Sequence, residues 1–221
     1  MDIERAMRRP FTNVHQFFIG GLVQLVPILN FVNLGYALRN SGINGKVKDR
    51  LENYDMGEDF KQGFYSWVIG LVYGIPVMVA VIVGIIVITA MVMNGADPGV
   101  LLLGVPPLIL LGILMFFYII LIAIMMPAAK LYYYRRQELG EAFRFKDIAR
   151  RVFTRDYMLA FLLVLAVSIG FGLVLMPLYV LVSIPYVQYL FMVPYWYATA
   201  LAGYASLMIS FTLYGEVLSK K

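Results

Sequence analysis

Five acidic side chains between the first and second apolar stretches come nearest to the spacing of a metal site. They are Asp49, Glu52, Asp55, Glu58 and Asp59. On a helix, Asp55 would share a face with Glu58 and Asp59, because residues three and four apart are neighbours. Carboxylates gathered in this way can hold a divalent cation. However, Asp55-Met-Gly-Glu58 also has the pattern of a capping box that starts a helix, and basic residues in the loop neutralise the acids. We therefore expect helix capping, and no metal, cofactor or catalytic residue.

Other catalytic chemistry is poorly represented. The chain has no cysteine and one histidine, which excludes a cysteine nucleophile and argues against a zinc site. No aspartate, glutamate, lysine, arginine or histidine lies within the last four apolar stretches. Proton relays and ion coupling run through such side chains, so we expect neither an enzyme nor a proton-coupled transporter.

A second candidate site is a basic amphipathic segment near Ala142–Phe153. Its apolar residues recur at helical spacing with cations between them. The residues expected at the membrane surface are Phe145, Lys146, Ile148, Arg150, Arg151 and Val152. Such a helix suits the cytoplasmic headgroup layer, where it would bind anionic lipid. The alternative is a connector that merely lies flat between two spans.

A third group combines amides, a proline and aromatic rings in or beside apolar stretches. Its members are Pro27, Asn30, Asn33, Tyr186, Tyr189 and Trp196. These residues can line a groove or a path for an uncharged or amphiphilic solute. In the simpler interpretation, the amides satisfy backbone groups at a bend, and the rings form an ordinary interfacial belt.

The composition requires these elements to lie in a membrane. Of 221 residues, 62% are hydrophobic and 14% charged, whereas soluble proteins are nearer one half and one quarter. The mean hydropathy is +0.80. We therefore expect an all-α, multi-pass protein of the cell membrane, without a nucleic-acid surface.

Five apolar stretches are long enough to cross about 30 Å of hydrocarbon. They are Phe17–Leu38, Phe64–Met93, Val100–Ala129, Tyr157–Val182 and Pro194–Tyr214. Turns are expected at Asn94–Gly99 and near Ser183–Val193, which carry no lysine or arginine. The basic residues elsewhere place the two polar loops and the C-terminal tail in the cytoplasm.

The first stretch has basic residues on both flanks, which a simple crossing cannot keep on one side. We expect a re-entrant or in-plane helical hairpin that bends at Pro27–Asn30, with Asn13 and Asn40 both cytoplasmic. Four further transmembrane helices complete this fold; five full crossings are the alternative. The domain is single, over 1–221. Its segments are 1–15, the hairpin at 17–38, a loop at 39–63, a helical hairpin at 64–129, an amphipathic loop at 130–156, a second hairpin at 157–215 and a tail at 216–221.

Several short motifs occur in a fixed order along the chain. They are Asp2-Ile-Glu-x-Ala6, Pro10-Phe11, Ile19-Gly-Gly-Leu, Pro27-Ile-Leu-Asn-Phe31, Gly35-Tyr36, Leu51-Glu-Asn-Tyr-Asp55, Gly57-Glu58, Phe60, Gly63, Tyr73-Gly-Ile-Pro76, Gly140-Glu-Ala-Phe143, Phe145 and Ile148. In these motifs the chain resembles one uncharacterised prokaryotic membrane family, domain of unknown function 4013. The resemblance covers nearly the whole chain and departs at Tyr54, where the family pattern has tryptophan after proline. It implies a polytopic fold and leaves the function open.

Three functions are compatible with these features. The leading hypothesis is a non-enzymatic membrane protein that binds lipid or a protein partner through its cytoplasmic face and helix grooves. The alternatives are a transporter or channel for an uncharged or amphiphilic solute, and an enzyme acting on lipid headgroups. Small residues at helical spacing, Gly70, Gly74, Ala80 and Gly84, also allow a homo-oligomer.

Overall fold

The computed structural model describes residues 2–45, 47–93 and 98–219, and these residues form helices and no strand. The elements are α1 (Ile3–Arg8), η1 (Arg9–Phe11), α2 (Val14–Leu25), α3 (Asn30–Arg39), α4 (Met56–Met93), α5 (Pro98–Arg136), η2 (Leu139–Phe143), α6 (Phe145–Val152), α7 (Arg155–Val182) and α8 (Gln188–Ser219). The prediction of an all-α fold is confirmed.

Four helices are long and apolar enough to cross a membrane. They lie in α4, α5, α7 and α8. All four extend past the predicted apolar stretches, α7 by only two residues. In α4, α5 and α8 the polar ends of the helices continue into a packed region. The first apolar stretch is different: it yields only the short apolar helix α2, of 12 residues. Such a helix is about 18 Å long, so it cannot serve as a fifth span.

The first stretch is broken where the sequence predicts. Val26 leaves helical geometry, with φ −101° and ψ 113°, and α3 begins at Asn30. The two short helices, α2 and α3, contact each other, since the Asn33 amide donates to the Gly20 carbonyl oxygen at 2.8 Å. The flanks also meet, because Arg5 and Asp49 form an ion pair at 3.2 Å. The two ends of the stretch therefore lie on the same side of the fold.

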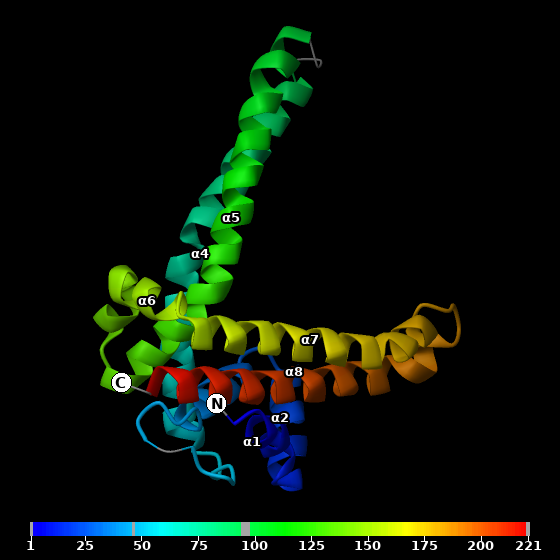
Figure 1. Ribbon diagram of the computed structural model, residues 1–221. Helices are drawn as coiled ribbons and strands as arrows, with labels where there is room; N and C mark the ends of the chain where they lie inside the picture. The colour runs from blue at the N-terminus through cyan, green and yellow to red at the C-terminus, as the bar shows by residue number, and fades with distance from the viewer. Residues whose placement is uncertain (1, 46, 94–97, 220–221) are drawn as a thin grey trace.

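Two long hairpins, α4–α5 and α7–α8, extend in different directions from a shared region that holds both chain termini (Figure 1). We call the shared region, residues 2–73, 122–163 and 200–219, the base. The remaining described residues, in 74–121 and 164–199, form two arms. The hairpins meet in the base, where the Tyr157 hydroxyl of α7 donates to the Ile124 carbonyl oxygen of α5 at 2.8 Å.

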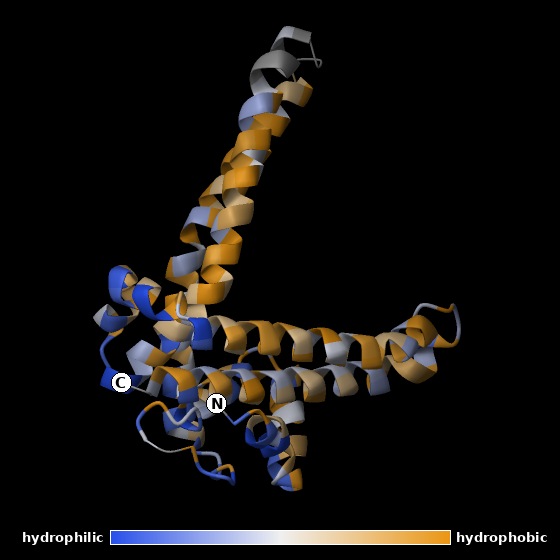
Figure 2. Ribbon diagram, viewed as in Figure 1, coloured by the Kyte–Doolittle hydropathy of each residue, from blue (hydrophilic) through white to orange (hydrophobic). Residues whose placement is uncertain are grey.

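Burial differs sharply between the two regions. Among the described residues of the arms, only Ala80 is buried, whereas the core lies in the base. Figure 2 shows that the arms are largely apolar and that hydrophilic residues gather at the base. Because apolar side chains such as Ile85 and Leu173 are more than half exposed, the arms have the surface of helices solvated by lipid.

The expected turns are placed in part. Residues 94–97 of the Asn94–Gly99 turn lie outside the described part of the chain. The second turn is shorter than predicted, because α8 already begins at Gln188. Pro194 lies inside α8 and does not end the helix, which corrects the expectation that it interrupts the chain there.

Candidate functional site

Two glycines allow α3 and α4 to cross with their backbones in contact. A Cβ atom on Gly35 would overlap the carbonyl oxygen of Asp59, and one on Gly63 would overlap that of Phe31. Only glycine permits so close an approach of two helices. The crossing brings the end of α3 against the first turns of α4 and fixes the polar side chains that flank it.

An arginine and an aspartate lie on the two sides of this crossing. Arg39 donates from Nε and Nη2 to the two carboxylate oxygens of Asp59, each at 2.7 Å. Its Nη1 donates to Glu52 at 3.1 Å. Asp59 is completely buried, so the bidentate pair compensates a charge that would be costly alone. The pair therefore links α3 to α4 at their crossing.

Aromatic rings connect the same crossing to the loop before α4. Tyr36 and Tyr54 stack with ring centroids 4.0 Å apart. The Tyr36 hydroxyl donates to the Glu52 carbonyl oxygen at 2.6 Å, and the Tyr54 hydroxyl donates to Asn33 at 2.8 Å. Tyr54, the residue that departs from the family pattern, thus fills a stacking position that an aromatic ring of another type can also occupy.

The acidic group is distributed among separate partners. Asp55 accepts a hydrogen bond from the Glu58 backbone N–H at 3.1 Å, so the predicted cap is confirmed. The return bond comes from Asp59, which accepts from the Asp55 backbone N–H at 2.9 Å. Asp49 pairs with Arg5, and Glu52 pairs with Lys48 as well as Arg39. The hydrogen bond from Lys48, together with Arg39, lowers the pKa of Glu52.

The amphipathic segment forms α6, preceded by the 3-10 turn η2. Ile148 and Val152 are completely buried against the base, so this side of α6 faces the protein. Phe145 is 54% exposed, and Lys146, Arg150 and Arg151 are also exposed. Four of the six residues expected at the membrane surface are therefore accessible. The buried aliphatic pair attaches α6 to the fold.

The position of α6 is fixed by Tyr73, at the end of the base in α4. The Tyr73 hydroxyl donates to the Ala142 carbonyl oxygen at 2.7 Å, and its ring lies 5.5 Å from that of Phe145. Buried Glu141 pairs with Arg136 at 3.1 Å and with Arg144 at 3.3 Å. These contacts hold α6 at the foot of the α4–α5 arm (Figure 1).

The residues expected to line a groove or path are not all together. Asn33 is completely buried, and its amide also donates to Gln24 at 3.0 Å. Pro27 and Asn30 lie at the bend, while Tyr186 and Tyr189 are exposed near the far turn between α7 and α8. Only Trp196 joins a groove of about 480 Å³, between α2 and α8. Its lining residues are Gln24, Leu25, Tyr195, Trp196, Thr199, Ala200 and Gly203.

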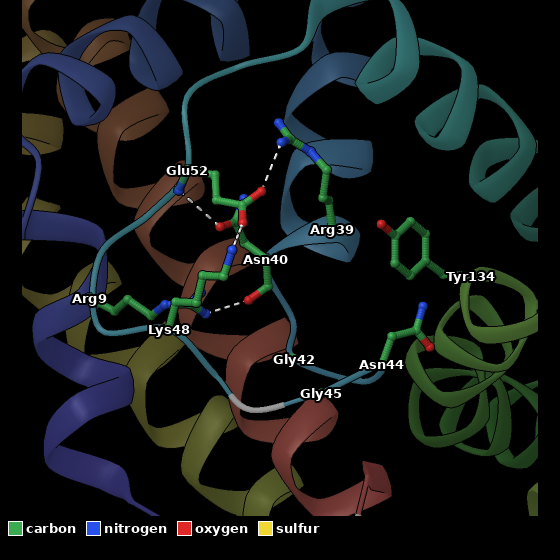
Figure 3. A pocket seen from close by; sticks show the side chains of 9 residues that line it. All are labelled: Arg9, Arg39, Asn40, Gly42, Asn44, Gly45, Lys48, Glu52 and Tyr134. Carbon is green, nitrogen blue, oxygen red and sulfur yellow. Dashed lines mark hydrogen bonds and ion pairs between the residues drawn. The ribbon is translucent and has the colours of Figure 1, made fainter.

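A separate polar pocket of about 190 Å³ opens in the base (Figure 3). It is formed by η1, the end of α3, the loop that follows and the end of α5. The lining residues are Arg9, Arg39, Asn40, Gly42, Asn44, Gly45, Lys48, Glu52 and Tyr134. In Figure 3, Arg9 and Lys48 lie on one side and Asn44 and Tyr134 on the other. This pocket gathers three cations and one carboxylate.

Arg9, Arg39 and Thr212 form contacts that the sequence did not predict. A usable signal exists for the central pair: Gly35 and Arg39 are four apart on α3, as are Asp59 and Gly63 on α4. On each helix a glycine and a charged residue therefore share one face, and the charges on the two helices have opposite signs. No comparable pattern marks Arg9, whose partners are remote in sequence.

Comparison with known proteins identifies a family. No curated protein and no solved structure matches the chain. The family described as "Protein of unknown function (DUF4013)" matches residues 19–180, a segment that contains the Gly35–Gly63 crossing, the Arg39–Asp59 pair and α6. Because the match covers well over half of the chain and agrees with the motifs above, this protein belongs to the DUF4013 family.

Proposed function

We propose that this protein is a non-enzymatic, multi-pass membrane protein that binds anionic lipid through a cytoplasmic base. One observation carries the proposal: α6 is fixed at the foot of an apolar arm with Lys146, Arg150 and Phe145 exposed. At this level the surface changes from the hydrophilic base to the apolar arm (Figure 2). Headgroups would therefore meet the cations of α6.

The chemistry of α6 favours an anionic surface. Each lysine or arginine near a charged leaflet is worth about 1 kcal/mol, and such leaflets face the cytoplasm. The exposed rings of Phe145 and Phe153 suit the boundary between headgroups and acyl chains. By the positive-inside rule, the basic residues of the base favour a cytoplasmic location for this side and for both termini.

The hairpin of α2 and α3 supplies a second contact with lipid. Its bend exposes Val26, Ile28 and Leu29 at 44%, 66% and 44%. An apolar tip whose two flanks meet through the Arg5–Asp49 pair suits a re-entrant hairpin that enters and leaves the bilayer on one side. The neighbouring groove at Trp196 suits a lipid acyl chain, because its walls are mainly aromatic and aliphatic.

The two alternative functions have less support. A path for a solute through the hairpin would use Asn33, but its amide and carbonyl are occupied by Gly20, Gln24 and Tyr54. A metal-dependent headgroup enzyme would use the acidic group, but those carboxylates pair with arginine, lysine and backbone N–H groups. Binding therefore remains the function that the geometry favours.

The test compares lipids and matched charge variants. Protein purified in mild detergent and stripped of lipid is heated with phosphatidylglycerol or with phosphatidylcholine. We expect phosphatidylglycerol to raise the melting temperature more, and the difference to shrink at high salt. The double variant Lys146→Gln/Arg150→Gln should lose most of the difference. Arg50→Gln/Lys61→Gln, with the same change in charge on exposed residues, should keep it. Equal stabilisation by the two lipids, or equal loss in both variants, would contradict the proposal.

A further inference from the structure

Arg9 is buried, with 2% of its surface exposed. Its Nη1 donates to the Asn40 carbonyl oxygen and, at 2.9 Å, to the Thr212 hydroxyl. Its Nε has no hydrogen-bond partner among the described residues. No carboxylate of those residues lies within 4.0 Å of it in an ion pair. A buried arginine without an anion is unusual, because charges removed from water are normally paired.

The other charges of the pocket are already engaged. Arg39 is held by Asp59 and Glu52, and Lys48 by Glu52. Glu52 therefore forms ion pairs with two cations, Arg39 and Lys48, and does not neutralise the charge of Arg9. Desolvation by burial lowers the pKa of Arg9, and the more distant charges of Asp49 and Glu52 oppose this only in part. The pocket is thus a place where a further negative charge would be stabilised.

We propose that this pocket binds the phosphate group of an anionic ligand, with the guanidinium group of Arg9, which lines the pocket, as a principal donor. Lys48 supplies a second positive charge from the exposed rim, and the side chains of Asn44 and Tyr134 line the opposite wall (Figure 3). A volume of about 190 Å³ suits a tetrahedral oxyanion with part of its substituent, since one water takes about 30 Å³ in the liquid. Arginine is well matched to phosphate because its planar donors bind two oxygens at once.

The location gives the bound phosphate a structural role. Through Arg9 the pocket contacts Thr212 of α8, and through Tyr134 it contacts the end of α5. A ligand there would link α5 and α8, one helix from each long hairpin, within the base. The phosphate can belong to a lipid headgroup or to a soluble molecule, since either presents the same oxyanion. The site is separate from α6 and does not depend on the lipid binding proposed for that helix.

The experiment measures binding to the whole protein in detergent after lipid removal. Inorganic phosphate is titrated at constant ionic strength against chloride, and the melting temperature is recorded. In parallel, native mass spectrometry scores retention of phosphatidic acid. Arg9→Gln should weaken binding about tenfold or more, as expected for a lost hydrogen bond to a charged group. Arg8→Gln, a change of the same charge at an exposed neighbour, should leave binding unchanged.

The results with inorganic phosphate and with phosphatidic acid distinguish a soluble phosphate compound from a lipid headgroup. A shift with inorganic phosphate that depends on Arg9 identifies a soluble phosphate compound. Retention of phosphatidic acid that depends on Arg9, without a shift by inorganic phosphate, identifies a lipid headgroup. Absence of both effects in the unmodified protein would overturn the proposal, as would equal loss in Arg8→Gln.

A second pair of variants covers the case in which Arg9→Gln fails to fold. Lys48→Gln removes a positive charge from the exposed rim, and Asn44→Asp adds a negative charge to it. Neither change touches the core, so both proteins should fold. Both should bind phosphate or phosphatidic acid several times more weakly. Unchanged binding in both variants would overturn the proposal, whatever the result at Arg9.

Discussion

Several glycines of the base and most described glycines of the arms occupy opposite environments. A Cβ on Gly20, Gly35, Gly63 or Gly215 would overlap a neighbouring side chain or backbone carbonyl. At Gly74, Gly84, Gly112, Gly170 and Gly172, nothing lies within 4 Å of the Cβ position, and at Gly104 only the flexible side chain of Met91 does. The base therefore uses these four glycines to bring packed segments together, whereas none of these arm glycines approaches the backbone of another helix. The base is packed like a protein core, and the arms expose apolar side chains of the kind that a bilayer solvates.

The largest expected effect comes from filling a glycine position in the base. Gly35→Ala should destabilise the fold by about 4 kcal/mol or more, because the atoms that the new Cβ would overlap belong to the backbone of the packed helix α4. Gly84→Ala in the α4–α5 arm should be neutral or stabilising by up to about 1 kcal/mol, since alanine is the better helix former. Melting temperatures and yields of monodisperse protein in detergent measure the difference. Similar losses for both variants would remove the distinction between base and arms.

Breaking the buried ion pair should have the next largest effect. Asp59→Asn leaves Arg39 without its bidentate partner and should cost about 3 kcal/mol. The matched control is Glu4→Gln, which removes an exposed pair with Arg8 and should cost less than about 1 kcal/mol. If thermal unfolding shows equal stability for the two variants, the Arg39–Asp59 pair does not stabilise the crossing of α3 and α4.

A smaller effect is expected where the two long hairpins meet in the base. Tyr157→Phe removes the hydroxyl that donates to the Ile124 carbonyl oxygen while keeping the ring stacked on Tyr214. The loss should be about 1 kcal/mol, or roughly 2–4 °C in melting temperature. Tyr179→Phe, at an exposed position in the α7–α8 arm, should shift the melting temperature by less than 1 °C, roughly within error. An equal shift would show that the buried bond contributes nothing.

The smallest effect depends on pH. The pKa of Glu52 is lowered chiefly by the hydrogen bond from Lys48, so the folded state favours the ionised carboxylate. Its contribution is present above the usual pKa of 4.5 and is lost as the pH falls through the lowered value. Wild-type protein should exceed Glu52→Gln in stability at pH 7 by less than about 1 kcal/mol. The gap should close in acid; a gap that widens there would contradict the assignment.

The sequence was most informative where one local signal decided the structure. Apolar length predicts the four long helices, Asp55 predicts the start of α4, and Pro27 with its basic flanks predicts the break in the first stretch. It was less informative where the outcome depends on a distant partner. The periodicity that defines α6 is the same whether Ile148 meets lipid or protein, and the structure buries it.

The small-residue pattern shows the same limit. Spacing alone gives Gly70 and Gly74 of α4 the same weight as Gly63, but only Gly63 meets another helix backbone. Likewise, Arg39 and Asp59 are twenty residues apart, and although each shares a helix face with a glycine, that local pattern does not say which two helices meet. The burial of Arg9 is harder still to predict, because it depends on Thr212 near the other end of the chain. Such contacts follow from the crossing of the helices, which composition does not encode.

The central claim is that α4, α5, α7 and α8 cross the membrane, whereas the two ends of the α2–α3 hairpin lie on one side of it. The chain contains no cysteine, so single cysteines can be introduced at Arg8 and Arg50, exposed residues on either side of the α2–α3 hairpin. Intact cells are treated with an impermeant thiol reagent, and Tyr186→Cys, at the exposed far turn, serves as the positive control. We expect labelling of position 186 in intact cells, and of positions 8 and 50 only after permeabilisation. Labelling of position 8 in intact cells, with position 50 still protected, would show that the first stretch crosses the membrane and would contradict the account.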